Sequence, residues 1–441
     1  MIDFLMSGGN FMFQNEATAG MWGLIENCSI SNSAPAGVSP SYAFRSGSSG
    51  MTMKTPNLGT NFGALIAGIR IYMSNLTSIV PLIAFLDSNA LPQCDLRING
   101  SGQFYFTRNG TTIGSTSSYA IAAGAWAYIE FKAILSASGA GVCEVRVNGN
   151  VVLSSGSLTN AQNTGSYVYG ATASVVEFNS PAIGGDIFFR DFYVVDTVNG
   201  VNTSYLGDIN VLEVYPNGPG VNSAWSQGLT STVPPPTAPP PPFTVTAVSG
   251  SGSSWTFTGS WTEGAANAFI GYNFNTTSCG TGNNQTSVQC TASAAGSITL
   301  NFSGGSAQSG LTGSAAFECI VEIGINNSGT RPNGDVAYIY DSTPGDISDF
   351  VHQSLNAALG HNFSGVILGI AHLSYLRKDD AGSRSVAQVC LSSSATAVGP
   401  TISLGNTYVY YTQILEVDPN TSSQWSAANF NLATFGTKLV A

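Results

Sequence analysis

The chain has 441 residues, a formal net charge of −11 and only 8% charged residues. This negative charge disfavours contact with a phosphate backbone, so no nucleic-acid partner is expected. No apolar run approaches the roughly 20 residues of a membrane-spanning helix, which excludes insertion by such a helix.

The start of the chain, Met1-Ile-Asp-Phe-Leu-Met6, lacks a basic region, and its apolar run is too short for a signal peptide. From there to residue 228, short apolar segments alternate with Gly, Ser and Asn turns about every ten residues. This spacing predicts an all-β fold, with residues 1–228 forming an antiparallel jelly-roll sandwich.

Three Asn-Gly pairs, at Asn99, Asn109 and Asn148, predict two-residue hairpin turns in this block. The segment from Tyr128 to Lys132 alternates apolar and charged residues, as does Cys143-Glu-Val-Arg-Val147. We expect Tyr128, Phe131, Val145 and Val147 to face the core, with the charged residues between them facing outward.

Several segments of this block resemble the laminin-G-like domains of bacteriophage structural proteins, which belong to the concanavalin-A-like lectin jelly rolls. They are Gly124-Ala-Trp-Ala-Tyr-Ile-Glu-Phe-Lys132, Gly141-Val-Cys-Glu-Val-Arg-Val-Asn-Gly149, Arg190-Asp-Phe-Tyr-Val-Val-Asp196 and Leu206-Gly-Asp-Ile-Asn-Val211. The resemblance implies a two-sheet jelly roll and often carbohydrate or surface binding. It supplies no ligand residues, because no calcium-site pattern matches here, and whether calcium binds stays open.

Residues 229–242 contain seven of the chain's 19 prolines, between positions 234 and 242. Proline fixes φ and removes the amide donor, so a polyproline linker is predicted here. A plain spacer is the favoured interpretation. A docking motif for a proline-reading domain is the alternative.

Residues 243–441 again alternate in the manner of strands, and predict a second β-sandwich domain. One helix is expected at 346–359, ended by Gly360. A recurring phrase supports two similar sandwiches, with chance recurrence as the alternative: Leu212-Glu-Val-Tyr-Pro-Asn217 precedes Trp225, and Leu415-Glu-Val-Asp-Pro-Asn420 precedes Trp425. The segments 375–389 and 416–440 also resemble the C-terminal part of phage virion proteins.

The seven cysteines form no Cys-x-x-Cys pair and lie at no ligand spacing with the three histidines. They are expected to be buried and reduced, although a bridge between Cys279 and Cys290 stays open. No metal and no cofactor is expected. His352 and His361 are assigned surface or capping roles, and Asp379-Asp380 a solvated charge cluster.

Aromatic side chains are the candidate ligand-binding groups, because Tyr and Trp combine a flat apolar face with a polar edge. Tyr105, Tyr167 and Tyr169 are the residues predicted to bind a ligand. No residue is assigned a catalytic role, and the chain is not expected to be an enzyme.

Together these features predict a structural protein of a bacteriophage virion, assembled in the host cytoplasm. The sparse charge suits such a particle, since the surface must then consist of hydroxyl, amide and backbone groups. The expected role is a homo-oligomeric tail or head appendage that binds other virion proteins and contacts a host surface glycan. The alternatives are a capsid decoration or connecting protein that binds only viral neighbours, and a polysaccharide-cleaving enzyme.

Overall fold

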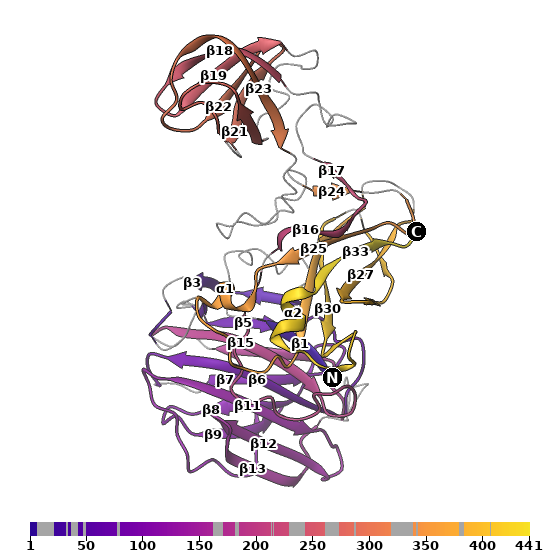
Figure 1. Cartoon of the computed structure of the whole chain (residues 1–441). Helices are drawn as coiled ribbons and strands as arrows, with labels where there is room; N and C mark the ends of the chain where they lie inside the picture. The colour runs from indigo at the N-terminus through magenta and orange to yellow at the C-terminus, as the bar shows by residue number, and fades with distance from the viewer. Residues whose placement is uncertain are drawn as a thin grey trace. The chain divides into compact units, whose positions relative to one another are not determined.

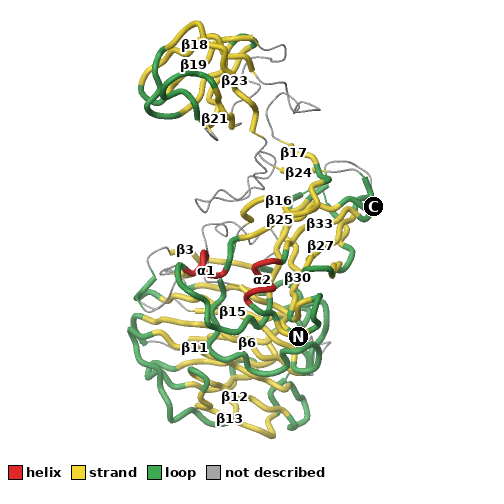
Figure 2. Tube along the Cα trace, in the orientation of Figure 1, coloured by secondary structure: helices red, strands yellow, loops and turns green. Residues whose placement is uncertain are grey.

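The computed structural model consists almost entirely of strands, which confirms the predicted all-β class (Figures 1 and 2). It describes residues 1–6, 22–31, 34–36, 43–46, 50–76, 80–161, 171–180, 185–212, 214, 216–228, 243–260, 273–285, 288–318, 338–340, 343–378, 383–405 and 407–441. Neither helix in this part of the chain has the length and apolar character needed to cross a membrane.

The described residues divide into two compact units. Unit 1 contains described residues 1–223 and 343–441, and unit 2 contains described residues 224–318 and 338–340. This division differs from the predicted boundaries of 1–228 and 243–441, because the C-terminal hundred residues or so join the N-terminal block.

Two antiparallel sheets of unit 1 form a sandwich. Sheet A has eight strands, β13 (Asn150–Leu158), β12 (Gly141–Val147), β11 (Trp126–Ile134), β6 (Ala64–Met73), β15 (Ile187–Asp196), β4 (Ala43–Ser46) and β3 (Cys28–Ser31) in order, with β1 (Ile2–Met6) paired to β15. Sheet B has seven, in the order β10 (Thr111–Ile113), β9 (Phe104–Arg108), β8 (Pro92–Ile98), β7 (Val80–Leu86), β14 (Val175–Ser180), β5 (Met51–Lys54) and β2 (Leu24–Glu26).

Aromatic side chains fill the space between sheets A and B. Phe131 of sheet A stacks on Phe85 and Phe106 of sheet B, with ring centroids 4.9 and 5.7 Å apart. All three side chains are fully buried. The alternation of strand residues thus places one set of side chains in a common core, as the sequence predicts.

Two of the three Asn-Gly pairs form the predicted two-residue turns. Asn109 and Asn148 have φ of 47° and 49°, and the glycine after each is also in the left-handed region. The third pair opens a longer loop, in which Asn99 Oδ1 accepts bonds from Ser101 N (2.9 Å) and Gln103 N (3.0 Å).

A third sheet explains why the two ends of the chain share unit 1. Its strands are β16 (Pro216–Ser223), β25 (Ile347–His352), β33 (Thr434–Leu439), β27 (Ser385–Ser392) and β28 (Ala395–Val398), with β29 (Ile402–Ser403) paired to β27. Two ribbons accompany it, β26 (Ile370–Leu376) with β30 (Val409–Leu415) and β31 (Val417–Asp418) with β32 (Ser423–Gln424). Because β16 pairs with β25, the segment before the proline-rich stretch and the segment after unit 2 lie in one sheet.

The helix predicted at 346–359 is confined to its C-terminal part. Helix α1 spans Leu355–Leu359, capped by Ser354 and ended by Gly360 at φ 72°. The preceding residues form strand β25, because pairing with β33 and β16 outweighs their helical spacing. A second helix, α2 (Ala427–Leu432), was not predicted.

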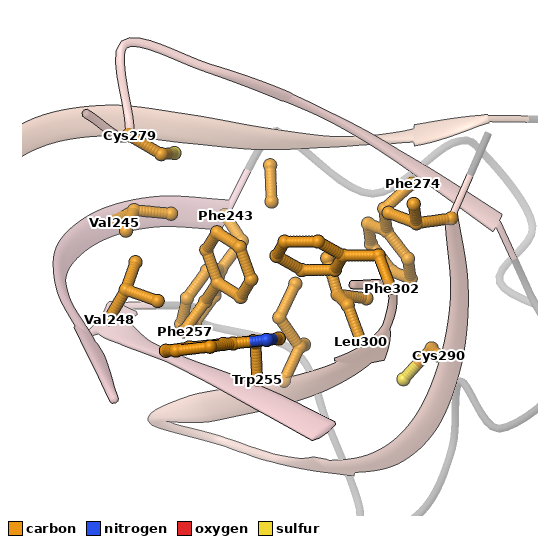
Figure 3. Packing of buried hydrophobic residues seen from close by; sticks show 13 residues of the cluster. Phe243, Val245, Val248, Trp255, Phe257, Phe274, Cys279, Cys290, Leu300 and Phe302 are labelled. Atoms are coloured by element: carbon orange, nitrogen blue, oxygen red, sulfur yellow. The ribbon is translucent and has the colours of Figure 1, made fainter. Parts of the chain in front are cut away.

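Unit 2 closes as a barrel where the sequence predicts a sandwich. Its strands are β18 (Phe243–Ser251), β19 (Ser254–Ser260), β22 (Ser297–Asn301), β21 (Val288–Ala294), β20 (Asn273–Thr277) and β23 (Gln308–Glu318). Unit 2 also contains a two-stranded ribbon, in which β17 (Ser226–Gly228) pairs with β24 (Tyr338–Tyr340). Figure 3 shows Phe243, Phe257 and Phe302 converging with Trp255 in the barrel core. The predicted polyproline linker lies outside the described residues.

The described cysteines are unbridged, and Cys279 and Cys290 occupy separate places in the barrel core (Figure 3). Five of the six are buried, which confirms their predicted use as small apolar groups, and Cys28 is half-exposed. Cys319 lies outside the described residues.

The recurring Leu-Glu-Val phrase does not close two separate sandwiches. Leu212 and Val214 from its first copy pack in the same core cluster as Leu415 and Trp425 from its second. Trp425 packs back as expected, and its Nε1 donates to Leu415 O at 3.3 Å.

Candidate functional site

The outer face of sheet A, which points away from sheet B, carries polar and aromatic side chains that contact one another. Strand alternation places Glu130 and Lys132 there, in phase with Tyr128. Tyr128 and Phe131 are three residues apart, so they lie on opposite faces of the strand. The prediction that both face the sandwich core is therefore wrong for Tyr128, although its side chain is buried.

A strap formed by residues 205–211 covers the middle of this face. Its bonds to sheet A are Leu206 N to Tyr193 Oη (3.3 Å), Gly207 N to Glu130 Oε1 (2.8 Å), Val211 N to Asp191 Oδ1 (3.0 Å) and Arg70 Nη2 to Ile209 O (2.7 Å). Ile209 also packs on Tyr128 and Tyr193. Gly68 lies under the Tyr193 ring, where a Cβ would overlap the ring.

Buried charges beneath the strap hold it in place. Asp191 Oδ2 accepts bonds from Arg70 Nε and Arg190 Nε, both at 2.8 Å, and Arg70 also pairs with Asp208 at 2.6 Å. Burial opposes the charge on Arg70, but the bonds to Asp191 and Asp208 outweigh it and raise its pKa. Because Arg190 and Asp191 are almost fully buried, this network is structural.

At one end of the face lies an aromatic row, formed by Trp126, Tyr72 and Phe188. The register of β11, β6 and β15 places these residues side by side across three neighbouring strands. The Tyr72 ring lies 5.5 Å from Trp126 and 5.9 Å from Phe188, measured between centroids. Trp126 is oriented by a bond from its Nε1 to Pro35 O (3.2 Å). Trp126 and Tyr72 remain partly exposed.

At the other end lies a charged cluster, formed by Lys132, Glu144, Arg146 and Tyr205. Lys132 is opposite Glu144 across the β11–β12 ladder, and Arg146 Nε bonds to Glu144 Oε1 at 2.8 Å. The Arg146 guanidinium lies 3.7 Å from the centroid of the Tyr205 ring, and Lys132 Nζ lies 6.0 Å from it. Burial, followed by the charge of Glu144, raises the pKa of Tyr205, so its hydroxyl stays protonated at neutral pH.

The predicted ligand residues lie elsewhere. Tyr105 is on the outer face of sheet B, opposite Arg97 in the β8–β9 ladder, and burial raises its pKa. Its neighbours Phe104 and Phe106 point into the sandwich core. Tyr167 and Tyr169 lie outside the described residues. The aromatic row was not predicted. Trp126 and Tyr72 each alternate with buried apolar neighbours in their strands, and this pattern was the available signal.

The two histidines assigned surface or capping roles lie outside sheet A. His361 is exposed, and the His352 ring nitrogens contact Gln353 O (2.8 Å) and Phe430 O (3.0 Å). Asp379-Asp380 lies outside the described residues. Within the ranges given above, no three or more His, Cys, Asp or Glu side chains gather in a way that could hold a metal ion.

No family model and no curated protein matches the chain. Among solved structures, it is similar to an endo-β-1,4-glucuronan lyase from the fungus Trichoderma reesei, with 12% identity, a TM-score of 0.33, and coverage of 44% of this chain and 95% of the lyase. It is similar to the cellulose induced protein Cip1, with 14% identity, a TM-score of 0.32, and coverage of 45% and 99%. It is also similar to the alginate lyase vAL-1 from Chlorella virus, with 13% identity, a TM-score of 0.28, and coverage of 40% and 93%.

These comparisons correct one prediction. The prediction that the chain is not an enzyme is contradicted by these structures, two of which are lyases of glucuronan and alginate. The likeness is one of fold alone, so it assigns no activity and no catalytic residue to this chain.

Proposed function

We propose that this chain is a structural protein of a bacteriophage virion and that its unit 1 contacts a host surface glycan. The observation that supports glycan contact is the aromatic row on the outer face of sheet A. The row presents three rings from neighbouring strands, two of them partly exposed. The virion assignment rests on the sequence resemblances and on the sparsely charged composition.

The aromatic row suits a sugar for two reasons. The apolar ring faces match the C–H faces of a pyranose, and the Tyr72 hydroxyl and nearby amides offer hydrogen bonds. The row is also rigid, because Trp126 is held by Pro35 and Phe188 is 6% exposed. A shallow site of this kind binds weakly alone, and a homo-oligomeric appendage would strengthen the contact by multivalency.

Replacing both Tyr72 and Trp126 by alanine is expected to weaken glycan binding roughly 5- to 150-fold, because each loses its stacking face, worth roughly 0.5–1.5 kcal/mol beyond buried area. The probe is a panel of purified bacterial surface polysaccharides, applied to the full chain in a surface-binding assay. Tyr105→Ala, which alters the outer face of sheet B, is the matched control and should bind as the wild type does.

Two results would contradict glycan contact through this row. One is unchanged binding by the folded double variant, with folding checked by thermal unfolding. The other is saturable binding to capsid or tail proteins with no binding to any polysaccharide, which favours a decoration or connecting protein.

A second candidate function is cleavage of the bound glycan, favoured by the charged cluster. Lys132, Glu144 and Tyr205 are groups that can transfer protons, and Arg146 can stabilise negative charge beside them. The cluster shares strand β11 with the aromatic row.

Lys132→Ala is expected to abolish any release of reducing ends from the polysaccharide that binds, while Tyr105→Ala leaves release unchanged. Lys132 is the sharper target because no ion pair joins it to Glu144 or to another described carboxylate, so its loss disturbs the fold little. Absence of product with wild-type protein under saturating binding would eliminate this candidate.

A further inference from the structure

Two buried cysteines face each other across the sandwich core. Cys94 lies on β8 of sheet B and Cys143 on β12 of sheet A, and their Sγ atoms are 3.6 Å apart. Both residues have no exposed surface. Among the described cysteines, this is the pair whose sulfur atoms are in contact.

Asn160 fixes one of the two sulfurs. Its Nδ2 donates to Cys143 Sγ at 3.3 Å and to Ile134 O at 2.9 Å, and its Oδ1 accepts from Ser136 N at 2.8 Å. The Asn160 side chain is fully buried, so these bonds hold it in one orientation. Cys143 Sγ therefore accepts a bond from Asn160 and lies within hydrogen-bond distance of Cys94 Sγ.

The same contacts make the two thiols unequal. The hydrogen bond from Cys94, helped by that from Asn160, lowers the pKa of Cys143 against the effect of burial. That hydrogen bond, together with burial, raises the pKa of Cys94. Thiolate is the reactive form of cysteine, so Cys143 is the first nucleophile of the pair.

We propose that Cys94 and Cys143 form a disulfide that ties sheet A to sheet B when the chain meets a low-molecular-weight disulfide such as oxidised glutathione. The Cys143 thiolate attacks one glutathione sulfur, the glutathione S–S bond breaks, and one glutathione thiolate leaves. The Cys94 thiolate then attacks the Cys143 sulfur of the mixed disulfide and releases the second glutathione. The two protein thiols lose two electrons and two protons, and one oxidised glutathione becomes two thiols.

The reaction needs a small movement and temporary access. The sulfurs must approach from 3.6 Å to the roughly 2.05 Å of a disulfide, which side-chain rotation and a slight closing of the sheets supply. Since both thiols are buried, glutathione must reach Cys143 through a local opening of the sandwich that keeps its contacts with Asn160 and Cys94. The half-exposed Cys28 is a poor competitor, because burial raises its pKa to about 12.

The bridge would close a chain segment whose ends are 49 residues apart. Cross-linking residues this far apart reduces the freedom of the unfolded chain, and lowers the unfolding equilibrium constant on the order of a thousandfold. The oxidised protein should therefore have a higher denaturant midpoint than the reduced protein.

The test is to refold the full chain in reduced and in oxidised glutathione and to count thiols with Ellman's reagent in denaturant. Oxidation should remove two of the seven thiols, leave the mass two hydrogens lower, and give a proteolytic peptide that joins Cys94 to Cys143. A Cys94→Ala variant should trap a glutathione adduct on Cys143, whereas Cys290→Ala should still form the bridge.

Retention of seven thiols, or a bridge that maps to another pair, overturns the proposal. The peptide map of the wild-type chain decides this even where a variant fails to fold. An oxidised protein with the correct bridge but an unchanged midpoint would contradict its stabilising role.

Discussion

Replacing Asp191 by alanine is expected to lower the free energy of unfolding of unit 1 by about 3–5 kcal/mol. The change leaves Arg190, of which 1% is exposed, buried without its carboxylate partner, and removes a 2.8 Å bond to Arg70. It also removes the acceptor for Val211 N, so the strap loosens. Asp191 has φ of 54°, which alanine tolerates less well than aspartate or asparagine.

Urea unfolding followed by tryptophan fluorescence measures this loss. Asp191→Asn separates the two causes, because asparagine tolerates the backbone conformation but carries no charge. Arg45→Ala is the matched surface control, since its pair with Asp186 is 47% and 43% exposed, and should cost no more than about 1 kcal/mol. Equal and small losses for Asp191→Ala and Arg45→Ala would refute the assigned role of the buried network.

Replacing Glu416 by alanine is expected to cost about 1–3 kcal/mol, because its carboxylate joins the C-terminal segment to the jelly roll. It accepts bonds from Ile2 N (2.9 Å), Val201 N (3.0 Å) and Asn202 Nδ2 (2.9 Å). Burial would raise the pKa of Glu416, but the bonds from Asn202, Val201 and Ile2 outweigh it and lower the pKa below its ordinary 4.5.

The lowered pKa makes this contribution depend on pH. Folding favours the ionised form, so the stabilisation is present above pH 4.5 and is lost as the pH falls through the lower folded-state pKa. Asp3 acts in the opposite sense, since burial and then the charge of Asp196 raise its pKa to about 7. Its contribution is therefore present below its ordinary pKa of 3.8 and is lost as the pH rises through 7.

Comparing the wild type with Glu416→Gln measures the Glu416 contribution together with its effect on Asp3, whose pKa the Glu416 charge helps to raise. The difference in denaturant midpoint between the two should be large at neutral pH and shrink toward acid pH. A difference that does not change with pH would mean that the charge of Glu416 does not carry the contact.

Local features were predicted where they depend on neighbouring residues alone. The Asn109 and Asn148 turns follow from the ease with which Asn and Gly adopt positive φ, and the end of α1 at Gly360 has the same cause. Phe131 was placed in the core because strand alternation has a period of two. The helix predicted at 346–359 failed over β25, where the ladder to β33 supplies hydrogen bonds that its local spacing does not reveal.

Most of the candidate site could not be predicted from the sequence, because it also depends on pairing between strands distant along the chain. Trp126 and Phe188 are 62 positions apart in the sequence, and only the register of β11 and β15 with β6 makes them neighbours of Tyr72. The prediction for Tyr105 rests on aromatic character, which does not tell one sheet face from another.

The sequence by itself therefore determined the all-β class, the tight Asn-Gly turns and the use of cysteine as a small buried group. These depend on backbone sterics, on alternation and on composition. Only the tertiary structure decided that β16 joins β25, that the strap covers the middle of sheet A, and that Cys94 meets Cys143. Each of these is a contact between residues distant along the chain, and its free energy depends on which sheet faces and edges are brought together by folding.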